Sequence, residues 1–420
     1  MMLNCFSAAD ILLPDFHKVR GEGWAVVACD QFTSEPEYWE KAREIAGNAP
    51  STLNLILPEA YLAETEKRVP NINETMRRYL SDVLIEHRNS MIYLERTQSD
   101  GRIRHGLIGK IDLECYDYKK GAVSAIRATE GTVAERIPPR VAIRRDAALE
   151  LPHVMVLIDD PEKTVIEPLA VKKKNFEVAY NFDLMLGGGH VSGWFPNDEE
   201  ISRVGRDLEA LVTPEAIRKK YGAAYEPLLF AVGDGNHSLA SAKAAYEEVK
   251  TKIGVEAAKR HPSRFALVEI VNLHDDALQF EPIYRVLFGV NPDDVMAAFD
   301  TYVAELDGKV SAQAVTCVGT FGRKTLTVPH PVSQLTVGTV QDFLDGYLAT
   351  HKGASVDYIH GIDAVEKISS RSDAIGFLFD GMAKDQLFKA VICDGALPRK
   401  TFSMGHARDK RYYLECRKIK

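Results

Sequence analysis

The chain has 420 residues, of which 45% are hydrophobic and 27% charged, a composition typical of a globular protein with two or three domains. Its formal net charge of −8 and pI of about 5.9 argue against a sequence-independent grip on nucleic acid, which needs a basic face. The 6 cysteines include no C-x-x-C pair, which indicates reduced thiols, and we find no signal-peptide pattern and no apolar run of membrane-spanning length. We therefore expect a cytoplasmic protein that does not enter the membrane.

Short apolar runs predict strands at 24–29, 53–58, 91–96, 105–113, 153–159, 228–233, 265–273 and 374–380. Apolar residues spaced three or four apart predict helices at 35–47, 63–89, 198–212, 237–254 and 292–306, the second of them broken near Pro70. Strands and helices alternate irregularly, which favours a mixed α/β or α+β architecture over a regular doubly wound sheet.

The pattern also predicts how the chain divides. We expect a main α/β body over 1–290 and a smaller helix–strand unit over 291–372. The segment 373–420 ends in the strand-like run "RYYLECRKI", and we expect it to pack back on the main body.

The first candidate site is "GDGNHS", Gly233 to Ser238, where an apolar strand stops and a helix begins. Backbone N–H groups and the helix dipole make such a junction suitable for binding an anion. The glycines, which lack side chains, would let a ligand approach the backbone closely. Asp234 could then hold a metal ion, and His237 could contact a phosphate oxygen or move a proton. The alternative is a plain turn in which Asn236 caps the helix.

Three other segments carry similar chemistry. The run "IRATEGTVAERIPPR" at 126–140 brings two threonines and a carboxylate together with arginines, which bind phosphate and carboxylate groups. Asp30 follows a predicted strand, where ligands of open α/β sheets bind. The loop 394–407 combines cations with hydroxyl groups. The pattern alone favours a plain surface loop for 126–140 and fits a surface loop equally well for 394–407. For Asp30 the pattern does not distinguish a site from a structural role.

Six blocks occur in a fixed order: "VACDQF", "GNAPSTLNLILPE", "ATEGTVAERIPPR", "VGDGNHSLASA", "FEPIYRVLF" and "LPRKTFSMG". Together they resemble, over nearly the whole chain, the bacterial domain-of-unknown-function family numbered one thousand and fifteen. The resemblance implies a ParB/sulfiredoxin-like nucleotide-binding core with large insertions, a fold that includes free-serine kinases. It implies a phosphotransferase that uses ATP or ADP with Mg²⁺ and acts on a small hydroxy amino acid such as serine, or on phosphoserine plus ADP in reverse.

The resemblance also implies roles for individual residues. The residues that it implies for catalysis are Asp234, which would also hold the metal, His237, Glu130 and Asp30. The residues that it implies for nucleotide binding are Gly233, Gly235, Asn236, Ser238, Arg136 and Arg140. Substrate binding is implied for Thr132, Arg285, Arg399, Lys400 and Thr401.

Two departures from the family pattern matter. Ser238 stands where the central block usually has an arginine, so one phosphate contact must come from elsewhere, for which Arg136, Arg140 and Arg399 are candidates, or be missing. Asn236 stands where sulfiredoxin has its catalytic cysteine, which argues against sulfinic-acid reduction. A nucleotide-binding regulator, such as a ParB-like DNA clamp, and an inactive scaffold stay open as alternatives.

Overall fold

The computed structural model describes residues 5–132, 135 and 137–420, in which the chain forms two compact units. Unit 1 comprises Met1–Leu278 with Gly405–Lys420, and unit 2 comprises Gln279–Met404. These bounds differ from the predicted ones in two ways: unit 2 begins at Gln279 rather than at 291, and it includes 373–404, which the prediction grouped with the last residues of the chain. Its strand β19 (Ala374–Leu378) pairs inside unit 2, whereas the residues after Met404 belong to unit 1.

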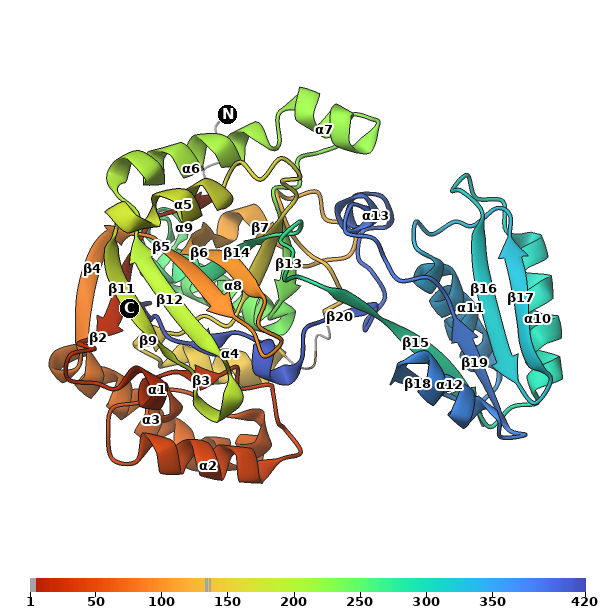
Figure 1. Cartoon of the computed structure of the whole chain (residues 1–420), viewed down its shortest axis with the longest axis horizontal. Coiled ribbons are helices and arrows are strands. Elements are labelled where there is room, and N and C mark those ends of the chain that lie inside the picture. The colour runs from red at the N-terminus through yellow and green to blue at the C-terminus, as the bar shows by residue number, and fades with distance from the viewer. Residues whose placement is uncertain (1–4, 133–134, 136) are drawn as a thin grey trace. The chain divides into compact units, whose positions relative to one another are not determined.

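A 10-stranded mixed sheet forms the centre of unit 1 (Figure 1). Its strands, in spatial order, are β11 (Glu177–Asp183), β12 (His190–Phe195), β5 (Ile92–Thr97), β6 (Ile103–Asp112), β14 (Phe265–Asn272), β10 (Met155–Ile158), β13 (Phe230–Asp234), β8 (Ile126–Ala128) and β7 (Tyr116–Asp117), with β1 (Phe6–Ser7) against β6. The pairs β10–β14, β13–β8 and β7–β8 are parallel and the others antiparallel. The expected mixed α/β class is therefore confirmed.

Helices surround this sheet. They are α4 (Ile137–Arg145), α5 (Glu167–Lys172), α6 (Asp198–Ala210), α7 (Pro214–Tyr221), α8 (Asn236–Ile253) and α9 (Val255–Ala258). The predicted helices at 198–212 and 237–254 are thus confirmed to within two residues at each end.

The helices α1 (Gly21–Trp24), α2 (Pro36–Ala46) and α3 (Thr65–Asp82) gather at one end of unit 1, drawn red to orange in Figure 1. They bury Trp24, Trp39 and Tyr79 in a common apolar core. Small two-stranded sheets border this core, formed by β2 (Ala9–Pro14) with β4 (Leu84–Ser90), β3 (Val26–Val27) with β21 (Tyr412–Tyr413), and β9 (Leu149–Glu150) with β22 (Arg417–Lys418).

Two of the sequence predictions in this region are wrong. The segment 53–58 is no strand: it begins inside a short 3₁₀ turn, η1 (Thr52–Asn54), whose N-cap residue Ser51 accepts a hydrogen bond from Leu53 N at 3.2 Å. The predicted helix at 63–89 does not break at Pro70, which lies inside α3, but ends at Asp82, after which the chain forms strand β4.

The last residues of unit 1 are tied to the sheet by buried charges. Both oxygens of the fully buried Glu269 are engaged, because Arg104 donates to them at 3.2 and 3.4 Å and Arg411 donates to Oε2 at 2.7 Å. Arg411 also pairs with Glu415, whose other oxygen accepts a hydrogen bond from Tyr180 at 2.6 Å. The C-terminal segment therefore supplies both backbone pairing and charge to unit 1.

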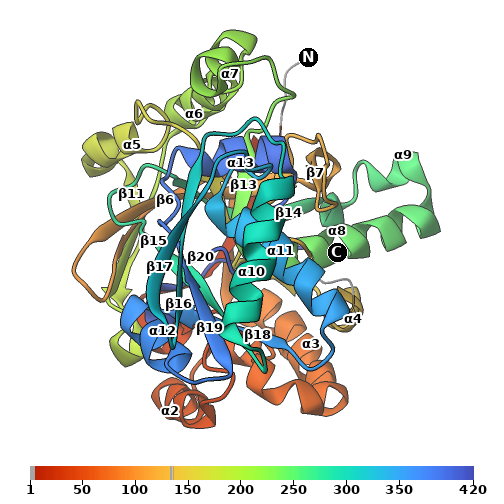
Figure 2. The same ribbon diagram turned by 90° about the vertical axis from the view of Figure 1, so that its right-hand side faces the viewer.

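Unit 2 is built on an antiparallel sheet with the order β17 (Gly322–Val328), β16 (Gln313–Gly319), β19, β15 (Phe280–Phe288) and β18 (Ser355–His360), with β20 (Phe402–Met404) against β15 (Figure 2). Its helices are α10 (Pro292–Glu305), α11 (Thr336–Thr350), α12 (Ile362–Ser369) and α13 (Gln386–Asp394). The rings of Phe299 on α10 and Phe343 on α11 meet edge to face, and Phe299 meets Phe377 on β19 in the same way. These contacts hold the two helices to the sheet.

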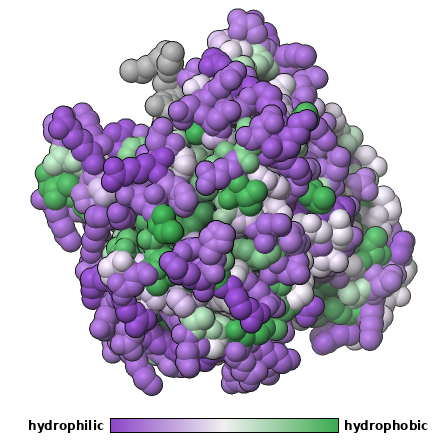
Figure 3. Space-filling model, turned by 60° about the vertical axis from the view of Figure 1, so that its left-hand side comes forward, coloured by the Kyte–Doolittle hydropathy of each residue, from purple (hydrophilic) through white to green (hydrophobic). Residues whose placement is uncertain are grey.

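The face in Figure 3 is mostly hydrophilic, with apolar residues distributed in small groups. Among the helices of the described residues, none combines the length and the apolar character that a membrane crossing requires.

Candidate functional site

The register of three strands brings the first candidate residues to one edge of the large sheet. Strand β13 runs parallel to β8, with Val232 opposite Ala128, so Asp234 and Glu130 lie at corresponding ends of neighbouring strands. Strand β10 runs antiparallel to β13, with Met155 opposite Asp234, so His153 lies just before β10 at the same edge. The sheet therefore gathers two carboxylates and an imidazole from distant parts of the chain.

The turn between β13 and α8 depends on Gly235. Its φ of 78° and ψ of 26° are left-handed, and a Cβ atom there would lie 3.0 Å from the Cα of Val154. Gly235, rather than Asn236, occupies the N-cap position, so the alternative in which Asn236 caps the helix is wrong. The N-cap residue Gly235 makes no side-chain cap hydrogen bond, and the first N–H groups of any helix have no partner within the helix itself. Asn236 Oδ1 is buried without a described partner.

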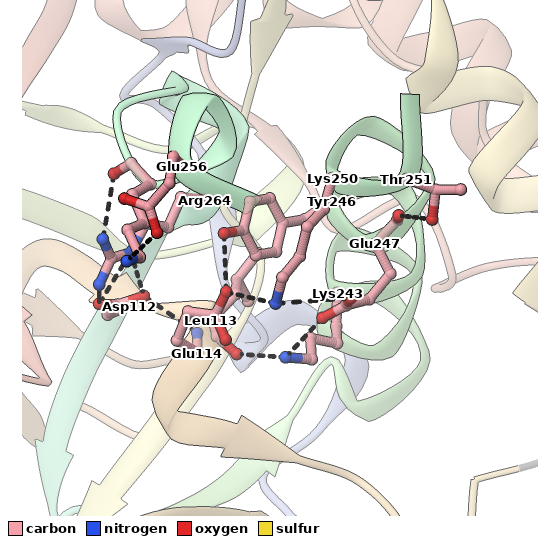
Figure 4. Close-up of polar contacts among 11 residues, drawn as sticks. Asp112, Leu113, Glu114, Lys243, Tyr246, Glu247, Lys250, Thr251, Glu256 and Arg264 are labelled. Atoms are coloured by element: carbon pink, nitrogen blue, oxygen red, sulfur yellow. Dashed lines mark hydrogen bonds and ion pairs between the residues drawn. The ribbon is translucent and has the colours of Figure 1, made fainter. Parts of the chain in front are cut away.

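Further along α8, side chains anchor the helix to the end of β6 (Figure 4). Lys250 and Tyr246 both donate to Glu114 Oε1, at 2.7 and 2.8 Å, and Lys243 donates to the carbonyl of Leu113 at 2.9 Å. Glu114 lies in the 3₁₀ turn η3 (Leu113–Cys115), directly after β6. These contacts fix the helix against the sheet and thereby fix the position of its first turn.

A chain of hydrogen bonds crosses the start of α8. Ser238 Oγ lies 2.8 Å from His153 Nε2, and His153 Nδ1 lies 2.8 Å from Tyr413 Oη. Tyr413 Oη also accepts a hydrogen bond from the backbone N of Cys29 at 3.3 Å. Burial raises the pKa of the Cys29 thiol to about 12, so that thiol stays protonated and is no nucleophile. The imidazole of His153 is thus held on both sides.

Charged groups complete the surroundings of this turn. Asp234 Oδ1 accepts a hydrogen bond from Gly235 N at 3.0 Å, and Asp234 Oδ2 lies 3.4 Å from Lys410 Nζ. Burial alone would raise the pKa of Asp30, but the electrostatic interactions with His153 and Lys410 and a hydrogen bond from Gln31 outweigh it and lower that pKa. Asp30 is therefore ionised at neutral pH.

A cavity with a volume of about 180 Å³ opens beside this turn. Its polar wall includes His153, Ser238, Tyr413 and Arg140, the last of which is ion-paired with Glu59. The lining also includes apolar side chains, among them Leu55, Leu57, Met76 and Leu267. An apolar pocket with a few convergent polar groups is the usual form of a small-molecule site.

A family model described as "Protein of unknown function (DUF1015)" matches residues 13–416. The chain belongs to the DUF1015 family. A comparison with curated proteins gave no significant match.

Solved structures resemble this DUF1015 protein only weakly. A free serine kinase in complex with AMP shares 10% identity at a TM-score of 0.37, over 74% of this chain and 91% of its own. SbnI from Staphylococcus aureus, truncated at its C-terminus, shares 11% identity at a TM-score of 0.34, over 71% of this chain and 82% of its own. A conserved hypothetical protein from Pyrococcus furiosus shares 10% identity at a TM-score of 0.34, over 74% of this chain and 94% of its own.

Several of the predicted residues thus lie together in the DUF1015 protein. Asp234 and Glu130 share the sheet edge, and Asp30 comes within electrostatic range of His153 and Lys410. Gly233, Gly235, Asn236, His237 and Ser238 form the strand end and the first helical turn. Thr132 follows Glu130, and its hydroxyl is buried without a described partner. Arg136 lies outside the described residues.

The other predicted substrate ligands lie in unit 2. The side chain of Arg285 is fully buried and donates to the carbonyls of Arg399 and Lys400, both at 3.1 Å. The cations of Arg399 and Lys400 lie over the ring of Tyr358, at 5.8 and 5.1 Å from its centre. Arg285 thus braces this loop, and Thr401 closes it by donating to Pro398 O at 2.6 Å. Substrate binding by these residues stays a prediction.

Three residues of the site were missed by the sequence analysis: His153, Tyr413 and Lys410. His153 stands at the start of the predicted strand 153–159, next to the opening motif, which is a signal that could have been followed. Tyr413 and Lys410 gave no such signal, because only the pairing of β21 with β3 brings them beside Cys29 and Asp30.

The donor set at the turn fits Mg²⁺ held jointly with a nucleotide. Among the described residues no cluster of three or more His, Cys, Asp and Glu side chains forms a ready metal cage. Mg²⁺ commonly binds one or two carboxylates together with substrate phosphates, and Asp234 and Asp30 could supply those carboxylates.

Proposed function

We propose that this DUF1015 protein is a nucleotide-dependent phosphotransferase that acts on a small hydroxy amino acid such as serine, or on phosphoserine plus ADP in reverse. The observation that carries the proposal is the uncapped start of α8 at the wall of a cavity, beside Asp30, Asp234 and Lys410. The order of the six sequence blocks implies the same reaction class.

The start of α8 suits the phosphates of ATP or ADP. The N–H groups of a first helical turn and the helix dipole favour negative charge there. Gly235 lets the backbone turn without a side chain that would fill the space beside Val154. We therefore assign Gly233, Gly235, Asn236 and Ser238 to the phosphate-binding turn, with His237 on the same turn to contact the transferring group.

Two cations near this turn could replace the arginine that the family pattern has at position 238. Lys410 lies beside Asp234, and Arg140 lines the cavity, so both can contribute the charge that an arginine would supply at position 238. Phosphoryl transfer needs little more than such positioning and charge neutralisation. Arg136, which lies outside the described residues, stays a further candidate, and Arg399 belongs to unit 2.

The carboxylates would divide the remaining work. Asp30 is ionised and could accept the proton of the attacking hydroxyl, a role for which Glu130 is the second candidate. Asp234 would hold Mg²⁺ in place of its contact with Lys410. When bound, the ion would neutralise charge on the phosphates.

The test is phosphorus NMR of the purified protein with ATP or ADP and either serine or phosphoserine. We expect a phosphorylated or dephosphorylated amino acid to form, and Asp234→Asn to abolish its formation. The matched control is Asp276→Asn, at a side chain that is 93% exposed and whose partner Lys163 lies 3.4 Å away. Equal activity of Asp234→Asn and the control would contradict the assignment.

Two other outcomes would replace the proposal. Salt-sensitive DNA binding without transfer would favour a DNA-clamp regulator. Calorimetry that detects neither ATP nor ADP would favour an inactive scaffold.

A further inference from the structure

We propose that Ser238 is a phosphorylation site of the protein itself, at which the hydroxyl accepts the terminal phosphoryl group of bound ATP with His153 as the base. This inference rests on the proposed function, because it needs a nucleotide at the start of α8. Its carrying observation is the 2.8 Å contact between Ser238 Oγ and His153 Nε2 at the cavity wall.

The position of Ser238 on the helix sets the direction of its hydroxyl. With Gly235 as N-cap, Ser238 is the third residue of α8. Helical Cα–Cβ bonds tilt toward the N-terminus of their helix, so the hydroxyl leans toward the place where phosphates bind. Ser238 lines the cavity and is only partly buried, so a ligand can reach it.

The imidazole of His153 is set up to take a proton from that hydroxyl. With its own proton on Nδ1, His153 donates to Tyr413 Oη and leaves Nε2 to accept from Ser238. A nucleophile, a base and a third group that orients the base form the usual arrangement for an activated hydroxyl. The carboxylate of Asp30, which interacts electrostatically with His153, would stabilise the imidazolium that forms.

The proposed step balances without a further reactant. Ser238 Oγ attacks the terminal phosphorus of ATP, a new O–P bond forms, and the bond between that phosphorus and the bridging oxygen breaks. The hydroxyl proton moves to His153 Nε2, and ADP leaves with the bond electrons. The products are phosphoserine at position 238, ADP and a protonated His153.

A neighbouring serine on the same helix provides a matched comparison. Ser241 lies one turn further along α8, and its hydroxyl donates to the carbonyl of His237 at 2.7 Å. That contact is the usual one for a serine inside a helix and pairs the hydroxyl with no base. Ser238 and Ser241 therefore differ in activation while sharing helix, residue type and neighbourhood.

The experiment incubates the full chain with ATP labelled at the terminal phosphate and locates the label by peptide mass spectrometry. We expect label on Ser238 in the wild-type protein and in Ser241→Ala, and none in Ser238→Ala. The His153→Gln variant keeps an amide in place of the ring and should label Ser238 more slowly, by on the order of 100-fold. Label that persists in Ser238→Ala, or an unchanged rate in His153→Gln, would overturn the inference.

Calorimetry with ATP and phosphorus NMR with serine, run on the same preparation, separate this inference from the proposed function. Transfer to serine without label on Ser238 overturns the inference alone. Absence of ATP binding, of transfer and of label overturns both.

Discussion

Ser238 Oγ lies 2.8 Å from Nε2 of His153, although 85 residues separate the two in the chain. The contact exists because β10 and β13 pair antiparallel, which places the start of one strand beside the end of the other. The helix that follows β13 then carries Ser238 past the imidazole. Ser238, which stands where the family pattern has an arginine, therefore has His153 as a hydrogen-bond partner.

The left-handed turn at Gly235 should be sensitive to any side chain. We expect Gly235→Ala to lower the free energy of unfolding by about 2 kcal/mol, because φ is 78° and the new Cβ would lie 3.0 Å from Val154 Cα. Gly205 inside α6 is the matched control, since nothing lies within 4 Å of its virtual Cβ. Gly205→Ala should stabilise by about 0.5–1 kcal/mol. Urea unfolding measures both, and equal effects would contradict the strain.

Lys410 should contribute to nucleotide affinity. We expect Lys410→Met to weaken ADP binding by about tenfold, since it removes the cation beside Asp234 and Asp30. Lys418→Met, on the same C-terminal segment but paired at the surface with Glu86, should leave affinity unchanged. Calorimetry at two salt concentrations gives both values. An affinity that Lys410→Met leaves intact would show that other cations supply the charge.

Glu269 should make the stability of unit 1 depend on pH. Burial alone would raise its pKa, but Arg104 and Arg411 outweigh burial and lower the pKa below the ordinary value of 4.5. The ionised carboxylate therefore stabilises the fold above pH 4.5, and this contribution is lost as pH falls through the lowered pKa. We expect Glu269→Gln to cost about 3 kcal/mol at neutral pH, and the difference from wild type to shrink toward acid.

Urea titrations at several pH values would test this prediction. Glu256→Gln is the control, because Glu256 is 84% exposed and pairs only with Lys259 among the contacts of the described residues. A pH-independent difference between wild type and Glu269→Gln would contradict the assignment of the charge.

Substitution of Arg285 can distinguish a structural role, in which it holds the 399–400 loop, from a role in substrate binding. If its guanidinium braces the 399–400 loop, Arg285→Lys should lower the free energy of unfolding by about 2 kcal/mol and speed hydrogen exchange in that loop. If it binds substrate, the KM for the amino acid should rise without a change in exchange. Hydrogen-exchange mass spectrometry together with steady-state kinetics distinguishes the two.

Local pattern was enough to predict several of the regular elements. The strand at 228–233 and the helix at 237–254 appear as β13 and α8, since a short apolar run and three-to-four spacing report directly on burial. The predicted strand at 53–58 failed for the same reason. Leu53, Leu55 and Leu57 are all buried, but they enter the core from a turn that has no partner strand.

The candidate site was predictable only where its residues follow one another in the chain. "GDGNHS" was visible because strand, turn and helix are local. Tyr413 could not be found in this way, since its place beside Val26 depends on a strand pairing across nearly the whole chain. Such pairings are decided by tertiary packing, which no short window of sequence contains.

The return of residues after Met404 to unit 1 sets an order of events during protein synthesis. Lys410 and Tyr413 leave the ribosome only after all of unit 2 has been made, so β3 cannot pair with β21 before that point. Until then the nascent chain lacks Tyr413 at the cavity, Lys410 beside Asp234, and Arg411, which neutralises Glu269 alongside Arg104. Unit 1 is therefore completed only late in synthesis, after the whole of unit 2 has been made.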